Sequence, residues 1–176
     1  TATDHPPYAE AVDPGLAYDG ADLLRELRAL LGEAPPTLIA FPDPLDHHPD
    51  HRATALFVLL ALADTARAGA TPRLLAYLVH WPGWPPGWDA RVPLPPKAGP
   101  AQLVLPPGLP DRGLSRTALV LSDAEVAAKR TALARHVTQQ EDMAPFLATF
   151  VCRTEPFTVF TPAEVARVDA LIERRP

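Results

Sequence analysis

Residues 37–52 read TLIAFPDPLDHHPDHR, an apolar run that leads into a cluster of histidines and acids. The run at 37–41 lies between prolines, which predicts a short buried strand whose ends are fixed by proline. The cluster at 46–52 follows at once and holds three of the six histidines of the chain. Residues 53–63 are then apolar nearly all round, which predicts a helix packed deep against a sheet.

The flanking segments extend this pattern on both sides. Leucines at helical spacing follow Asp19 and stop at Gly32, which predicts an amphipathic helix. Residues 73–80 read RLLAYLVH and predict a second strand. Helix, strand, helix and strand in this order indicate an α/β fold with a parallel sheet and a right-handed crossover.

The carboxyl-terminal part carries two helix starts. Ser122 and Glu125 form the two ends of a capping box, and Thr161 with Pro162 predicts a second start and a closing helix to about Arg174. Four phenylalanines between these starts are expected to fill a core: Phe146, Phe150, Phe157 and Phe160.

Composition limits the class of protein. A chain of 176 residues is the size of one globular domain, so we expect a single α/β domain over residues 1–176. The net charge of -5 argues against nucleic acid as a partner, and no apolar run is long enough to cross a membrane. No signal peptide is visible, so we expect a cytoplasmic protein with a small neutral or polar ligand. Cys152, the single cysteine, is expected to be a buried apolar residue.

Residues 81–110 form an excursion rich in proline and tryptophan. Its proline content predicts a long surface segment without regular structure. Trp81, Trp84 and Trp88 would expose a large aromatic area in a free linker, so we expect them to pack on the domain and to wall a ligand cleft.

The cluster at 46–52 lies where ligands bind in such sheets, just beyond the carboxyl end of a strand. If the helix begins near Pro49, His48 and His51 share one side of its first turn, and Asp46 or Asp50 can orient an imidazole. One histidine could then bind zinc while the other acts as an acid, which suits hydrolysis. A polar helix cap with no further function is the plain alternative.

A second histidine position joins this site in the predicted fold. His80 ends the second strand and should lie beside the cluster, so it could line the site. A structural hydrogen-bonding role is the commoner one for a histidine at a strand end.

The segment from Pro42 to Ala53 resembles the D-x-H-P-D-H-R/G segment of the LmbE-like, or PIG-L, family of zinc-dependent N-deacetylases. A second segment from Lys129 to Gln139, followed by Glu155 and Phe157, is similar to that family's K-x-x-A-L-x-x-H-x-[ST]-Q and E-x-F pattern. Two motifs in the family order cover most of the chain.

The resemblance implies a hydrolase that removes an acetyl group from an N-acetylated sugar, such as an N-acetylglucosaminyl compound, or a related amine. By match to the motif, His51 would be the zinc ligand, His48 would stabilise or protonate the tetrahedral intermediate, and Asp50 would orient His48. The fold expected with it is a Rossmann-like three-layer sandwich with a mainly parallel sheet.

One departure from the family pattern limits how many of the family's site residues can be assigned to this chain. The family's A-H-P-D-D-E motif, which supplies two metal ligands and the general base, is not found, and His5 followed by Pro6 lacks both aspartates. The chain therefore looks like the carboxyl-terminal part of a larger domain, without the first strands of the family fold. The missing ligands could come from a preceding segment or another chain, or the site could be rebuilt from Asp43, Asp46 or His47.

Two hypotheses in which the protein does not use zinc stay open. The protein could be a catalytically silent relative that binds a sugar or a partner. It could also be an unrelated hydrolase that uses aspartate and histidine without a metal.

Overall fold

Helices and strands alternate only in the first part of the chain. The computed structural model describes residues 4–67, 72–86, 102–165 and 167. The elements in chain order are α1 (Gly20–Glu33), β1 (Leu38–Pro42), α2 (Pro49–Arg67), β2 (Arg73–Tyr77), β3 (Ser115–Val120), α3 (Asp123–Ala134), α4 (Val137–Ala148), β4 (Thr154–Phe160) and α5 (Pro162–Val165).

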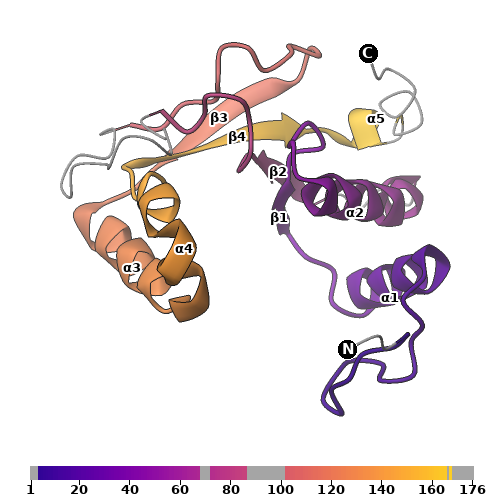
Figure 1. The fold of residues 1–176 in the computed structure, drawn as a ribbon. Coiled ribbons are helices and arrows are strands. Elements are labelled where there is room, and N and C mark those ends of the chain that lie inside the picture. The colour runs from indigo at the N-terminus through magenta and orange to yellow at the C-terminus, as the bar shows by residue number, and fades with distance from the viewer. Residues whose placement is uncertain (1–3, 68–71, 87–101, 166, 168–176) are drawn as a thin grey trace.

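The strands form one open mixed sheet in the order β1-β2-β4-β3 (Figure 1). β1 and β2 are parallel and are joined through α2, as predicted, whereas β4 runs antiparallel to both β2 and β3. The α/β class is therefore confirmed, but a mainly parallel sheet is not, since one of the three pairings among the described residues is parallel.

The antiparallel half was not anticipated because its strands lack the expected patterns. Every residue of β3 is exposed, so this edge strand shows no alternation of buried and exposed positions. β4 contains Pro156 although it lies between two neighbouring strands, a position where proline is uncommon.

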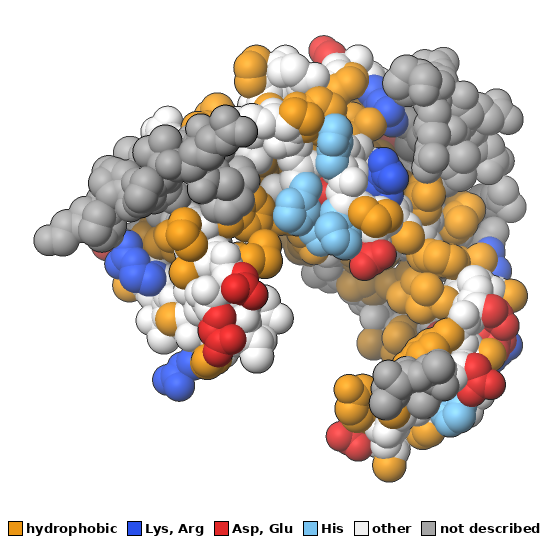
Figure 2. All heavy atoms as spheres, in the orientation of Figure 1, with side chains coloured by type: hydrophobic (Ala, Val, Ile, Leu, Met, Phe, Trp, Pro, Cys, Tyr) orange, Lys and Arg blue, Asp and Glu red, His pale blue; other side chains and the backbone are white. Residues whose placement is uncertain are grey.

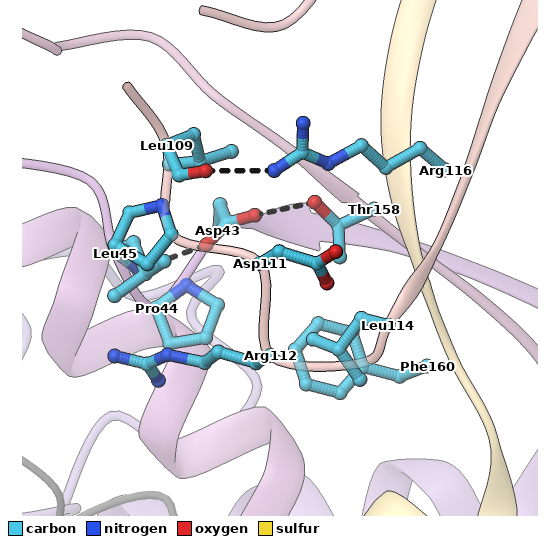
Figure 3. Close-up of a pocket in the computed structure, with 11 residues that line it drawn as sticks. Asp43, Pro44, Leu45, Leu109, Asp111, Arg112, Leu114, Arg116, Thr158 and Phe160 are labelled. Carbon is cyan, nitrogen blue, oxygen red and sulfur yellow. Dashed lines mark hydrogen bonds between the residues drawn. The ribbon is translucent and has the colours of Figure 1, made fainter. Parts of the chain in front are cut away.

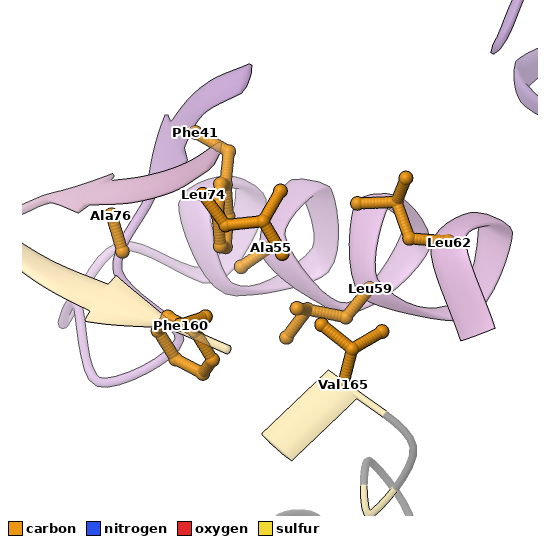
Figure 4. Packing of buried hydrophobic residues seen from close by; sticks show 8 residues of the cluster. All are labelled: Phe41, Ala55, Leu59, Leu62, Leu74, Ala76, Phe160 and Val165. Atoms are coloured by element: carbon orange, nitrogen blue, oxygen red, sulfur yellow. The ribbon is translucent and has the colours of Figure 1, made fainter. Parts of the chain in front are cut away.

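α2 supplies the centre of the main core. It begins at Pro49, as the sequence predicts, and Leu59 on it is fully buried. Figure 4 shows side chains of α2 packed together with side chains of β1, β2, β4 and α5. The cluster consists of Phe41, Ala55, Leu59, Leu62, Leu74, Ala76, Phe160 and Val165.

α1 lies beside α2 and is covered on little of its surface. Asp19 caps its first turn by accepting the backbone N–H of Asp22 at 2.9 Å, and the helix continues one residue beyond Gly32. None of its residues is buried, and the leucines Leu23 and Leu30 are about two-fifths exposed. The amphipathic helix is confirmed, but its apolar face is only partly covered by the rest of the described structure.

A second core forms around the start of the proline-rich excursion. Trp84 is buried and donates its indole N–H to the carbonyl of Val104 at 2.8 Å, and Trp81 is half-buried. Cys152 is buried in the same cluster, as predicted, and burial raises the pKa of its thiol. Trp88 lies outside the described residues, as does most of the predicted continuation of α5.

The described part of the chain contains no helix whose length and apolar content would suffice to cross a lipid bilayer.

The capping box of α3 gives a prediction of modest size. The Ser122 hydroxyl accepts the backbone N–H of Glu125, and the Glu125 carboxylate accepts the backbone N–H of Ser122. We expect Ser122→Ala to lower the free energy of unfolding by about 1 kcal/mol. Urea denaturation measures the change, and Ser115→Ala at an exposed position of β3 is the control. Equal stability of both variants would contradict a stabilising cap.

Candidate functional site

Three imidazoles from two distant segments meet beyond the carboxyl ends of β1 and β2. The ring of His48 lies 4.8 Å from that of His51 and 5.4 Å from that of His80, measured between centroids. The rings of His51 and His80 are 5.3 Å apart. Figure 2 shows histidine side chains gathered where this face is hollowed between α3 and α4 on one side and α1 and α2 on the other. We call these three residues the imidazole cluster.

Asp46 joins the two segments that carry the cluster. Its side chain is fully buried, and one oxygen accepts the backbone N–H of His48 at 2.8 Å. The other oxygen accepts the backbone N–H groups of Val79 at 2.8 Å and His80 at 2.9 Å. A single carboxylate therefore fastens the start of α2 to the chain that leaves β2.

The hydrogen bonds keep this buried carboxylate charged. Burial by itself would raise the pKa of Asp46, because the charged form loses its hydration. The donors from His80, His48 and Val79, together with the His51 ring, outweigh burial, and the pKa lies below its ordinary value. Asp46 is thus a fixed negative charge beneath the imidazole cluster.

The His51 ring lies against that charge. Its Nδ1 atom is 3.2 Å from Oδ1 of Asp46. The direction is unsuited to a regular hydrogen bond, and this buried nitrogen has no hydrogen-bond partner among the described residues. Nε2, on the other side of the ring, is the atom that could reach a ligand.

His48 and Asp50 interact through the main chain. Nδ1 of His48 lies 3.2 Å from the backbone N–H of Asp50, which donates to it, so its proton belongs on the other ring nitrogen. The Asp50 carboxylate is 4.0 Å from the same atom and is largely exposed. The proposed orientation of His48 by Asp50 therefore has a backbone contact to support it, whereas the carboxylate is at the limit of an ion pair.

His80 is the site residue that the strand pattern suggested, and Phe146 is the one that it missed. The Phe146 ring stacks on His80 with centroids 5.3 Å apart and planes 4° apart. Burial lowers the pKa of His80, the nearby His51 and His48 lower it further, and Asp46 opposes them. Sequence spacing predicted Phe146 only as a core residue, because its contact with His80 depends on how α4 folds back.

The other candidates from the first motif lie apart from the cluster. His47 is exposed and meets Trp81 edge-on, with centroids 4.9 Å apart. Asp43 is buried and accepts the backbone N–H of Leu45 at 2.9 Å and the Thr158 hydroxyl at 2.8 Å. Burial raises the pKa of Asp43 despite these bonds.

Asp43 lines a small pocket that contains no histidine (Figure 3). Loop residues and β4 form its walls, and Arg116 reaches over it to the carbonyl of Leu109 at 2.8 Å. The pocket and the imidazole cluster are therefore two separate features of the fold.

The second motif contains an ion pair between two of its segments. Lys129 on α3 forms a half-buried ion pair with Glu155 on β4, so two residues far apart in the motif meet. His136 is exposed at the start of α4 and makes no side-chain cap bond. It does not belong to the imidazole cluster.

The described residues would bind a metal ion only in part. Nδ1 of His51 lies against a buried carboxylate, as in many histidine ligands, but it lacks their regular hydrogen bond among the described residues. Within residues 4–67, 72–86, 102–165 and 167, however, no group of three His, Cys, Asp or Glu side chains is placed to hold an ion. The described residues thus provide one suitable ligand but not a complete set.

Comparisons of the chain with protein-family models, with curated proteins and with solved structures found no match.

Proposed function

We propose that the chain carries the His48, Asp50 and His51 part of a zinc-dependent amide hydrolase site similar to that of LmbE-like N-deacetylases. Its substrate would be an N-acetylated sugar, such as an N-acetylglucosaminyl compound, or a related amine. The observation that carries the proposal is the His51 ring held against the buried charge of Asp46, beside His48 on the same helical turn. A mere polar cap would not require a fully buried carboxylate with three backbone donors.

Each residue has a role that its surroundings support. His51 would be a zinc ligand through Nε2, since Asp46 faces its other nitrogen. His48 would give a proton to, or stabilise, the tetrahedral intermediate, with the Asp50 backbone N–H orienting its ring. When bound, zinc supplies an activated water for attack on the amide carbonyl.

We also propose that the whole domain has a Rossmann-like architecture. The β1-α2-β2 unit is the parallel half expected of a Rossmann-like three-layer sandwich. The remaining zinc ligands would come from a segment outside the described residues or from another chain. A cytoplasmic location also belongs to the proposal.

Substitution of His51 tests the assignment directly. The protein, in the longest form that its gene encodes, should retain zinc after dialysis and release acetate from an N-acetylglucosaminyl compound. We expect His51→Ala to lose both properties, because the ligand is removed. His5→Ala, an exposed histidine far from the cluster, should keep both. Metal content by mass spectrometry and acetate release are the measurements, and an unchanged zinc content of His51→Ala would refute the ligand role.

A silent binding module is the second candidate. The half-buried ring of Trp81 beside His47 favours it, since an aromatic face next to polar groups suits a sugar ring. Measurable sugar binding by a protein that retains no zinc would support this candidate over the hydrolase.

A further inference from the structure

The main chain of His80 is held from both sides by the first motif. Its N–H is donated to the Asp46 carboxylate at 2.9 Å, and its carbonyl accepts the N–H of His47 at 2.9 Å. These two backbone hydrogen bonds therefore fix the position from which the His80 side chain projects.

The His80 ring contacts three other rings, those of Phe146, His51 and His48. Phe146 from α4 is parallel to it within 4°, with centroids 5.3 Å apart, and Phe146 is itself buried. His51 faces the ring at the same 5.3 Å separation and an angle of 29°. The order of contacts is Phe146, His80 and His51, so α4 reaches the site through His80.

The His51 ring needs such a support. Its Nδ1 has an electrostatic contact with Asp46 but no regular hydrogen bond among the described residues. A ring without a directional bond can rotate about its side-chain torsions unless flat neighbours restrict it. His48 and His80 are the rings that face it.

We propose that His80 is a positioning residue whose ring, seated on Phe146, sets the orientation of the His51 imidazole. The contact acts through the flat face of the ring and not through its nitrogens, for which no described residue is a hydrogen-bond partner. The geometric claim stands without the hydrolase. Its use, which is to aim Nε2 of His51 at a ligand, rests on the proposed function.

The test reads the His51 ring directly, by nuclear magnetic resonance of histidine side chains labelled with carbon-13 and nitrogen-15. In the wild-type protein we expect ring-current-shifted His51 proton resonances and one dominant tautomer. His80→Ala should mix the tautomers, whereas loss of the His80 ring current alone would change the proton shifts and leave one tautomer dominant. His80→Phe, which keeps a flat ring without nitrogens, should restore the wild-type pattern, and His5→Ala should leave it unchanged.

The remaining outcomes are decisive as well. Phe146→Leu should mix the His51 tautomers as His80→Ala does, which gives a second test if His80→Ala does not fold. One dominant His51 tautomer in either variant, or failure of His80→Phe to restore one, would overturn the proposal. A wild-type protein with an ordered His51 ring but neither zinc nor acetate release would instead refute the proposed hydrolase and leave the positioning role intact.

Discussion

Asp46→Asn should lower the free energy of unfolding by about 2–4 kcal/mol, because each buried N–H left without an acceptor costs about 1–3 kcal/mol. The amide has nearly the same shape as the carboxylate, but one of its two acceptors becomes a donor. That donor would face the backbone N–H of His48 or those of Val79 and His80. Urea denaturation at neutral pH measures the loss.

Asp43→Asn is the matched control, since Asp43 is equally buried and lies on the same loop. Its amide oxygen can accept the N–H of Leu45, and its amide nitrogen can donate to the Thr158 hydroxyl, which also accepts. We expect stability to change by less than about 1 kcal/mol or to rise. Equal losses in both variants would show that burial, and not the pattern of donors, decides the cost.

The two aspartates also predict opposite pH dependences. The folded-state pKa of Asp46 is lowered, so its stabilisation is present above the unfolded-state pKa near 3.8 and is lost as the pH falls through the folded value. The folded-state pKa of Asp43 is raised, so its contribution is present below about 3.8 and is lost as the pH rises through the folded value. Asp46→Asn should therefore flatten the acid limb of the stability curve, and Asp43→Asn should steepen it.

Leu59→Ala should lower the free energy of unfolding by about 2–5 kcal/mol. Leu59 is fully buried on α2 in the main core, so its removal leaves a cavity between the helix and the sheet. Leu119→Ala removes the same atoms at a half-exposed position of β3 and should change stability by less than about 0.5 kcal/mol. Thermal and urea unfolding of the pair give the comparison, and similar losses would contradict the packing described for α2.

Sequence patterns predicted the first half of the fold well. The leucine spacing after Asp19 and the start of α2 at Pro49 are local signals that the structure confirms. The apolar run before Pro42 is a strand, as predicted, but the prediction that it is buried is wrong for Leu38 and Ala40, which are exposed on this edge strand. The capping box at Ser122 was equally local and is present. In each case, one element's own residues carried the information.

The second half needed contacts between distant segments. The helix that starts at the Ser122 capping box ends at Ala134, and α4 then turns back so that Phe146 reaches His80. β3 became a strand by pairing with β4, although none of its side chains is buried. Pairing of this kind has no periodic signature in the chain.

The candidate site likewise has a part that local sequence patterns predict and a part that depends on distant contacts. The spacing of His48 and His51 predicted their shared helical turn, and the strand pattern brought His80 beside them. The importance of Asp46 was only partly visible, because two of its three backbone donors lie more than thirty residues away. Backbone N–H groups occur in almost every residue type, so the sequence does not show which residues donate to a given carboxylate.

The position of Asp46 has a consequence for any survey of variants across this chain. A screen that scores ligand turnover or capture would rank residue 46 with those that touch the ligand, although its oxygens are committed to main-chain amides. Only a parallel score of protein abundance would separate the two kinds of residue, since loss at 46 would lower both scores together.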